Sequence, residues 1–430
     1  MMRLPQPNRA ARQAFFSLNR LYSMTNSSSS SLSEIPSDVQ DLVEVFLSKN
    51  STKISLQTLM KTGRGELLNR TYRDESFMYS NERVLMQVAN FIRHEMPIRL
   101  AHRIHDLDQV PMMREMPSVQ AVKSIYINSF LELIDQPVIR SPRDEEDFAK
   151  TLESLYENHS NVLIQMAQGA YELREAVRSG QLPDISETME KGGDIDFDRM
   201  DECHSFLDRF YMSRIGIRVL AGQYLSLRSI PRTDYIGMIC SCTSPYKVVQ
   251  HAARDATLMC TRKYGYAPNV VIHGRLDLTF SYVPTHLHYI LLELLKNAMR
   301  ATVEQHDECK DSKILPVVSV IIADAPENED IVIKVADEGG GIPRSQIDKI
   351  WSYLFTTADK HIQEDFIGRE NSQDHTSESP LAGLGYGLPI SRSYARYFGG
   401  DLNILSMEGF GTDAFVYLVR LGDSSEPCAV

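Results

Sequence analysis

Apolar and polar positions follow two different patterns along the chain, and the change falls near residue 230. In the first part, apolar residues recur every three or four positions, which is the spacing of amphipathic helices that pack on one another. Four long segments show this spacing, at 82–104, 119–133, 145–173 and 198–227. Breaks that contain proline or glycine separate them. The first part therefore predicts a four-helix bundle over residues 34–230.

In the second part, short runs of aliphatic residues alternate with helical stretches. Helices are predicted at 244–264, 285–305 and 388–398. Strands are predicted at 270–273, 278–283, 317–322, 330–336, 402–406 and 414–418. This alternation predicts an α/β domain over residues 231–421, followed by a tail at 422–430. The whole chain is therefore expected to be of the α+β class.

The composition is that of a globular protein, and it narrows the range of partners. The 430 residues carry a net charge of −12, which argues against a general nucleic-acid binder. No apolar run is long enough to span a bilayer, so no membrane partner is expected. The six cysteines form no CxxC pair, and Cys240 and Cys242 are the only close two. We expect a reducing compartment and no structural metal.

The N-terminus has a composition of its own. Residues 1–33 contain four arginines and no acidic residue, and a run of serines covers 27–31. Phe15, Phe16 and nearby leucines sit among the arginines at positions that suit one face of a helix. These features are typical of a mitochondrial transit peptide. A disordered tail is the alternative interpretation.

The predicted helix at 285–305 carries two polar residues that suit phosphoryl transfer. Leu287, Leu291, Leu294, Ala298 and Ala301 recur at helical spacing and predict a buried stripe, with Glu293, Asn297, Arg300 and Glu304 on the opposite face. Glu293 and Asn297 are four residues apart and therefore neighbours. A carboxamide oxygen can bind Mg²⁺, and a carboxylate one turn earlier can accept a hydroxyl proton. The alternative is a solvated polar face.

A second motif follows the predicted strand at 330–336. Asp337 ends this strand, and a carboxylate there can accept a hydrogen bond from the exocyclic amine of adenine. Gly339, Gly340 and Gly341 come next, and glycines let a backbone approach a ligand closely. A plain turn after a strand is the alternative. Three consecutive glycines favour the binding interpretation.

Two further glycine motifs lie towards the end of the chain. The stretch Gly383-Leu-Gly-Tyr-Gly387 precedes a predicted helix, where backbone N–H groups can bind phosphate. It matches neither a Walker A loop nor a dinucleotide fingerprint. Thr412 follows a glycine pair and can reach adenine or its water, although a hairpin turn explains it equally well. A polar, aperiodic stretch predicts a lid over 352–382, where Thr356 and Thr357 would contact phosphate.

In this order the four motifs resemble the ATP site of the GHKL (Bergerat) fold, an α/β sandwich shared by histidine kinases, type II topoisomerases, mismatch-repair ATPases and heat-shock chaperones. Longer stretches are similar to the mitochondrial pyruvate dehydrogenase kinase family. They lie at 97–104 and 210–218 in the helical half and at 293–302, 337–343 and 385–402 in the second half.

This resemblance implies a fold and an activity. The bundle would dock the lipoyl domain of the acyltransferase in the pyruvate dehydrogenase complex. The second domain would use ATP and Mg²⁺ to phosphorylate serine on the decarboxylase component, which inactivates the complex. The family also implies a homodimer that pairs through the C-terminal domains, in the mitochondrial matrix.

The resemblance also assigns the site. Glu293 would be the general base, Asn297 the metal ligand, Arg300 a contact to phosphate and Asp337 the contact to adenine. The residues expected to contact ATP are Glu293, Leu294, Leu295, Lys296, Asn297, Ala298, Met299, Arg300, Asp337, Gly339, Gly341, Thr356, Thr357, Gly383, Leu384, Gly385, Tyr386, Gly387, Leu388 and Thr412.

The chain departs from the family in three respects. Tyr289 stands four residues before Glu293, where animal members often have histidine, and the Asp-Trp signature of their tails is absent. Residues 289–293 and 355–358 resemble the branched-chain 2-oxoacid dehydrogenase kinase, whereas the closing segment favours the pyruvate enzyme. The branched-chain kinase is therefore the alternative.

Other classes fit less well. The spacing around His94 does not suit a histidine-kinase phosphoacceptor helix, and a chaperone or topoisomerase ATPase would need a transducer domain after the ATP fold. A non-catalytic ATP-binding module would keep Asn297 and Asp337 but would not require Glu293.

Overall fold

The computed structural model describes residues 37–68, 80–179, 197, 200–306, 315–324, 330–356, 385–420 and 422–427. It divides into two compact units, each described here by itself. The first contains Gly65–Leu225 and the segment that ends at Thr52, and the second contains Lys53–Arg64 and Ser226–Cys428. The predicted transit peptide at 1–33 lies outside the described residues, as does most of the predicted lid.

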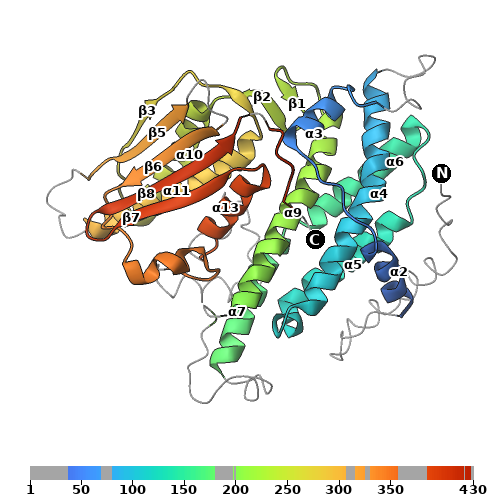
Figure 1. The fold of residues 1–430 in the computed structure, drawn as a ribbon, viewed down its shortest axis with the longest axis horizontal. Coiled ribbons are helices and arrows are strands. Elements are labelled where there is room, and N and C mark those ends of the chain that lie inside the picture. Colours follow the sequence, from blue (N-terminus) through green and yellow to red (C-terminus); the bar gives the residue numbers. More distant parts are fainter. Residues whose placement is uncertain are drawn as a thin grey trace. The chain divides into compact units, whose positions relative to one another are not determined.

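The first unit is helical (Figure 1). Its helices are α2 (Ser37–Leu47), α4 (Ser80–Gln109), α5 (Pro117–Ile134), α6 (Pro142–Asn158), α7 (Val162–Arg178) and α9 (Asp201–Arg228), whose last residues belong to the second unit. The predicted single helix at 145–173 is wrong, because α6 ends at Asn158 and α7 begins at Val162. The polar run between them interrupts the apolar spacing, and α6 begins earlier than predicted because Ser141 and Asp144 form a capping box.

A buried histidine lies at the break between α6 and α7. His159 is 6% exposed, and its Nε2 lies 2.8 Å from the Ser129 hydroxyl of α5. Burial, and then the charges of Arg214 and Arg218, lower the pKa of His159 to about 4. The ring is therefore neutral at physiological pH, and its hydrogen bond ties the break to the neighbouring helix.

Helix α4 is less amphipathic than its sequence predicts. Its buried surface includes Arg99 and Arg103, which are 2% and 1% exposed. Nε of Arg99 lies 3.0 Å from the Glu95 carboxylate, and Nη1 of Arg103 lies 2.7 Å from that of Asp106. Buried charges are tolerated when they are paired in this way. Hydrophobic spacing alone therefore underestimated how much of α4 is buried.

The second unit is built on a mixed five-stranded sheet (Figure 1). Its strands lie in the order β3 (Val270–Gly274), β5 (Val318–Asp324), β6 (Asp330–Asp337), β8 (Gly411–Val419) and β7 (Asp401–Met407). Strands β3 and β5 are parallel, and the other pairs are antiparallel. Along β6 the buried residues Ile331, Ile333 and Val335 alternate with more exposed ones. One face of the sheet is therefore the core face.

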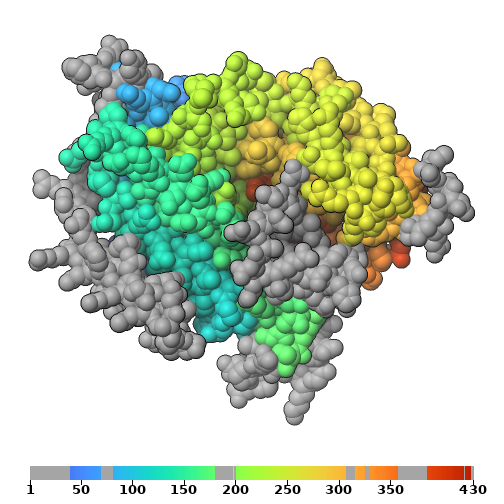
Figure 2. All heavy atoms as spheres, turned by 180° about the vertical axis from the view of Figure 1, so that it is seen from behind, coloured from blue at the N-terminus to red at the C-terminus, as the bar shows by residue number. Residues whose placement is uncertain are grey.

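Helices cover this core face. Helices α11 (Pro284–Gln305) and α13 (Gly387–Tyr397) pack on the sheet, and α10 (Pro245–Tyr264) packs on α11. The second unit is thus a sandwich of one sheet and a helical layer. Helix α10 lies on the face seen in Figure 2.

The second unit also contains a smaller sheet. Strands β1 (Tyr235–Ile236), β2 (Ile239–Thr243) and β4 (Phe280–Tyr282) pair in that order, all antiparallel. Strand β4 is shorter than the predicted strand at 278–283 and belongs to this sheet. Hydrophobic spacing predicted neither β1, which has only two residues, nor β2, along which buried and exposed residues do not alternate.

An early segment of the chain folds with the second unit. Helix α3 (Leu56–Gly63) begins after the N-cap Ser55, and the backbone at Ser55 pairs with Ser425 near the C-terminus. The Glu426 N–H donates to the Ile54 carbonyl at 2.8 Å, and its carboxylate accepts from the Tyr397 hydroxyl at 2.7 Å. The predicted bundle range of 34–230 contains this segment, which lies in the second unit.

Candidate active site

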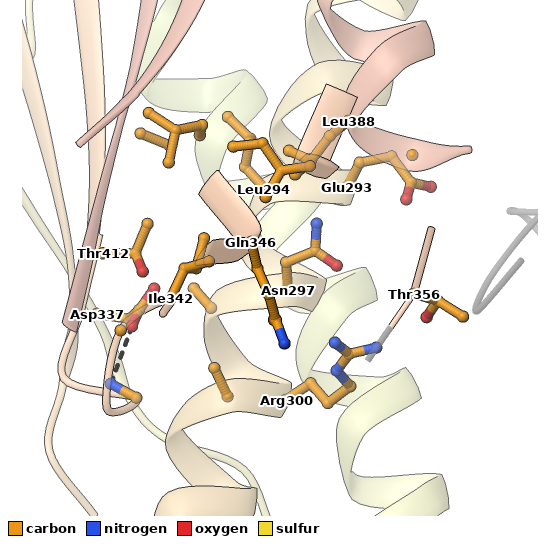
Figure 3. A pocket seen from close by; sticks show the side chains of 18 of the residues that line it. Glu293, Leu294, Asn297, Arg300, Asp337, Ile342, Gln346, Thr356, Leu388 and Thr412 are labelled. Carbon is orange, nitrogen blue, oxygen red and sulfur yellow. Dashed lines mark hydrogen bonds between the residues drawn. The ribbon is translucent and has the colours of Figure 1, made fainter. Parts of the chain in front are cut away.

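A cavity of about 500 Å³ opens on the core side of the main sheet. Its walls are contributed by α11, by β6 and the loop after it, by the 3₁₀ helix η5 (Arg344–Trp351), by the start of α13 and by β7 and β8 (Figure 3). All four sequence motifs contribute to it, although they are separated by up to about a hundred residues. The cavity is large enough for a nucleotide-sized ligand.

Helix α11 forms one wall. It begins at Pro284, which suits the first helical position because the missing N–H has no partner there. Glu293, Asn297 and Arg300 line the cavity, and so do Leu294 and Ala298. The prediction that the polar and apolar stripes lie on opposite faces is therefore wrong. Consecutive helical residues are about 100° apart, so the two stripes are adjacent and share one cavity.

Asp337 lies at the end of β6 in a partly buried position. Its Oδ1 accepts the Gly339 N–H at 2.9 Å. Burial raises the pKa of Asp337 to about 6, although backbone hydrogen bonds from Gly339 and Thr412 act in the opposite direction and Asp413 adds a smaller raising effect. A ligand that donates a hydrogen bond to this carboxylate would favour its ionised form.

The glycines after Asp337 allow close packing. A Cβ at Gly339 would lie 2.5 Å from the Cβ of Ala301 on α11. Gly341 has a φ of +71°, and a Cβ there would lie 2.2 Å from the Met407 carbonyl oxygen. Only glycine fits either position without displacing backbone. The loop is therefore held against α11 on one side and the β7–β8 hairpin on the other.

Glu293 is buried at the end of the cavity opposite Asp337 (Figure 3). The side chain is 5% exposed, and Nζ of Lys296 lies 2.8 Å from its Oε1. A Cβ at Gly387 would lie 2.4 Å from Oε2, so the start of α13 passes directly beside the carboxylate. Figure 3 shows Asp337 and Glu293 at opposite ends, with Asn297 between them. Asp337, which can accept a hydrogen bond from a nucleobase, therefore lies apart from Glu293, whose carboxylate can accept a proton.

The residues predicted to contact ATP fall into three groups. Those that line the cavity are Glu293, Leu294, Asn297, Ala298, Arg300, Asp337, Gly339, Gly341, Thr356, Gly385, Gly387, Leu388 and Thr412. Those that do not line it are Leu295, Lys296, Met299 and Tyr386; Leu295, Met299 and Tyr386 are fully buried in the core. Thr357, Gly383 and Leu384 lie outside the described residues.

Tyr289 lies one turn before Glu293. Its ring centroid is 5.0 Å from that of Tyr394 on α13. The neighbouring His288 points elsewhere, because its Nε2 lies 2.9 Å from the Asp255 carboxylate of α10. The aromatic pair therefore joins α11 to α13 close to the buried glutamate.

Sequence reasoning missed many of the residues that line the cavity. Val335, Ile404 and Ala414 come from three strands, while Ile342, Pro343, Gln346 and Ile350 come from the segment after the glycines. The alternation along β6 and β8 marks the core face, but it does not say which core positions border a cavity. The proximity of 342–343 to Asp337 was the one usable signal.

Metal binding is restricted to few protein ligands. Among the described residues, no three His, Cys, Asp or Glu side chains gather at one point. Asn297 presents a carboxamide to the cavity. This fits Mg²⁺, which takes few protein ligands and completes its shell with phosphate oxygens and water.

Among the described residues, none of the helices has the length and apolar character that crossing a membrane requires.

Two family profiles match the chain. The first, described as "Mitochondrial branched-chain alpha-ketoacid dehydrogenase kinase", covers residues 53–240. The second, described as "Histidine kinase-, DNA gyrase B-, and HSP90-like ATPase", covers residues 282–422. The second range contains every part of the cavity, so the predicted GHKL fold is confirmed.

Proteins similar along most of their length come from plants, fungi and animals. The mitochondrial [pyruvate dehydrogenase (acetyl-transferring)] kinase of Arabidopsis thaliana is 42% identical over 351 residues, 80% of this chain and 88% of the relative. Its namesake in Schizosaccharomyces pombe is 35% identical, over 80% of this chain and 90% of the relative. Isozyme 4 of the mitochondrial [pyruvate dehydrogenase (acetyl-transferring)] kinase in Mus musculus is 35% identical, over 93% of this chain and 87% of the relative. This chain therefore belongs to the mitochondrial pyruvate dehydrogenase kinase family.

Proposed function

We propose that this chain is an ATP-dependent protein serine kinase that phosphorylates and inactivates the decarboxylase component of the pyruvate dehydrogenase complex. One observation carries the proposal: a buried carboxylate, Glu293, borders the same cavity as the partly buried Asp337 at the end of β6. A non-catalytic module that only binds ATP needs Asp337 but not Glu293. The names of the relatives supply the substrate.

ATP would lie along the cavity with its adenine at Asp337. The ionised carboxylate would accept a hydrogen bond from the exocyclic amine of adenine, and Thr412 would lie beside it. The phosphates would extend towards Asn297, Arg300 and Thr356, which line the other part of the cavity. Backbone N–H groups at the start of α13 would add donors to these phosphates.

Glu293 would take the proton of the attacking serine hydroxyl. Lys296 holds the carboxylate in one orientation, and Gly387 leaves no room for it to turn towards α13. Mg²⁺ held by Asn297 would neutralise charge on the phosphates. Positioning and charge neutralisation contribute most of the acceleration in phosphoryl transfer, and general-base catalysis typically adds about 10²–10⁴-fold.

The partners follow from the same family. We infer that the bundle of the first unit docks the lipoyl domain of the acyltransferase and that the protein works in the mitochondrial matrix. We also infer a homodimer that forms through the outer face of the main sheet. Leu405 and Met407 on the edge strand β7 are 64% and 67% exposed on this face, and Ile321 of β5, separated from them by β6 and β8, is 36% exposed. Apolar side chains of this kind are usually covered by a partner.

The decisive experiment compares substrates. The purified protein would be incubated with Mg-ATP and, in parallel, with each purified 2-oxoacid dehydrogenase complex, and the residual activity of each complex would be followed. We expect the pyruvate complex to lose activity while serine phosphate appears on its decarboxylase component. Glu293→Gln is the matched control, and it should reduce the rate by about 10²–10⁴-fold while ATP still binds.

The branched-chain complex is the second candidate, because the profile over residues 53–240 carries that name. Inactivation of the branched-chain complex alone would transfer the substrate assignment to it. Inactivation of neither complex would contradict the proposed kinase activity. A near-normal rate with Glu293→Gln would contradict the role of the base.

A further inference from the structure

Strand β2, which forms a hairpin with β1, carries two cysteines whose sulfur atoms lie 4.0 Å apart. Cys240 is 7% exposed, whereas Cys242 is exposed to solvent. One residue separates them, so both side chains leave the strand on the same side. The other cysteines in the described residues, Cys203 and Cys260, are both buried. The pair therefore combines a short sulfur–sulfur distance with access from solvent.

We propose that Cys240 and Cys242 form a reversible dithiol–disulfide site that is oxidised by low-molecular-weight disulfides such as glutathione disulfide. In the first step the exposed Cys242 sulfur attacks one sulfur of the small disulfide, and the other half leaves as a thiol. Cys240 then attacks the Cys242 sulfur and releases the second half. Two electrons and two protons pass from the cysteines to give two small thiols.

The strand geometry suits a labile bond. A disulfide is about 2.05 Å long, so the two sulfurs must approach by roughly 2 Å. Residues two apart on a strand have Cα atoms about 6.6 Å apart, which is near the upper limit for a disulfide. The pairing of β2 with β4 is already irregular between Cys240 and Thr243, which gives this backbone room to bend. Strained disulfides are easily reduced, and this fits a reversible site better than a structural one.

The surroundings slow the oxidation of the pair. Desolvation, and then contact with Cys240, raise the pKa of the Cys242 thiol, and the side chain of Asp234 contacts it as well. Asp234 has a φ of +69°, an unusual conformation for a residue other than glycine. Because the thiolate is the attacking species, the exchange is slow and follows the redox buffer rather than brief exposure to oxidant.

The site is joined to the ATP-binding helix. Cys240 pairs with Tyr282 of β4, and the Thr243 hydroxyl donates to the carbonyls of both residues at 3.2 and 3.3 Å. Only Val283 separates β4 from α11, which carries Glu293. Contraction of β2 would therefore move the strand that leads into α11. We expect the oxidised protein to bind ATP less tightly, a consequence that rests on the proposed function.

Redox titration of the full-length protein tests the site. The protein would be equilibrated in glutathione buffers of increasing disulfide content, alkylated with N-ethylmaleimide and mapped by mass spectrometry. We expect the peptide containing Cys240 and Cys242 to lose two hydrogen atoms and to recover them with dithiothreitol. Cys242→Ser should abolish this change, and the matched control Cys260→Ser should not. Complete alkylation of both thiols at every ratio, or glutathione adducts alone, would overturn the proposal.

Calorimetry then tests the connection to α11. Oxidation should weaken ATP binding several-fold in the wild-type protein and should leave Cys242→Ser unchanged. A disulfide that forms without any change in ATP affinity would overturn the connection but not the site. Failure of the reduced protein to bind ATP would contradict the proposed function and would leave the dithiol result intact.

Discussion

The raised pKa of Asp337 predicts an unusual outcome for the substitution Asp337→Asn. In the protein without nucleotide, an ionised carboxylate is held in a partly buried position that favours its protonated form. Asparagine has nearly the same shape and can still accept the Gly339 N–H through its amide oxygen. The variant should therefore be more stable than the wild type while it loses ATP.

The size of the gain follows from the pKa. A rise from 3.8 to about 6 corresponds to roughly 3 kcal/mol, and solvent screening reduces this to about 1–3 kcal/mol. The folded state binds this proton more tightly than the unfolded state, so stability falls as the pH rises between about 4 and 6. The full cost is present above pH 6, about half of it remains at pH 5, and it vanishes below the unfolded pKa.

Thermal unfolding at two pH values and calorimetry measure both effects. At pH 8 without nucleotide, the unfolding midpoint of Asp337→Asn should exceed that of the wild type by about 3–9 °C. The difference should shrink to about half at pH 5. ATP affinity should fall by about 10- to 150-fold, the equivalent of 1.5–3 kcal/mol for a hydrogen bond to a charged acceptor.

The neighbouring Asp413 supplies a matched control. Its carboxylate lies 3.0 Å from Nζ of Lys334, and it does not line the cavity. Asp413→Asn removes this ion pair and only the smallest of the effects on the pKa of Asp337, so it should neither raise the midpoint at pH 8 nor lower ATP affinity. A variant Asp337→Asn that is less stable than the wild type at both pH values would refute the electrostatic reasoning. ATP affinity within twofold of the wild type would refute the adenine contact.

Three further substitutions test other parts of the molecule. Asn297→Ala should raise the Mg²⁺ concentration needed for half-maximal phosphorylation by at least tenfold, and an unchanged Mg²⁺ titration would remove Asn297 from metal binding. Gly339→Ala should destabilise the protein by about 1–3 kcal/mol in denaturant titration, because its Cβ would lie 2.5 Å from that of Ala301; unchanged stability would show that the loop can move. Leu405→Glu should shift the protein towards monomers in sedimentation experiments without lowering its unfolding midpoint, and an unaltered dimer would exclude this face.

Local signals in the sequence predicted the elements of the second unit well. Proline at the start of α11, apolar alternation along β6 and glycines around the loops each act over a few residues, and the corresponding helices and strands lie close to their predicted bounds. The resemblance to the family, and not these local signals, predicted that most of the charged and glycine residues of the cavity would be neighbours. They carry chemistry that is recognisable without coordinates.

Tertiary contacts were not predictable in the same way. Hydrophobic spacing reports that a side chain is buried but not what covers it, so the spacing predicted that Leu294 and Ala298 are buried, and only the resemblance to the family predicted that they border the cavity. Arg99 is buried because Glu95 pairs with it, which no periodicity reveals. Helix α3 looks like any short helix, and its place in the second unit depends on contacts with residues more than 360 positions away.

That last contact has a consequence for how the protein can be divided. In the order of the chain, α4, α5, α6, α7 and all but the last residues of α9 form an insertion within the second unit, which the chain leaves after Arg64 and re-enters at Ser226. A fragment that begins at residue 226 would keep the bond from Tyr397 to Glu426 but would lack Ile54, the other partner of this residue, which is only 4% exposed. A catalytic fragment should instead join residues 53–64 to 226–427 through a flexible linker. The first unit also contains the segment that ends at Thr52, so the chain passes between the units after Thr52, after Arg64 and after Leu225. A movement of one unit against the other must therefore be accommodated by these three connections at once.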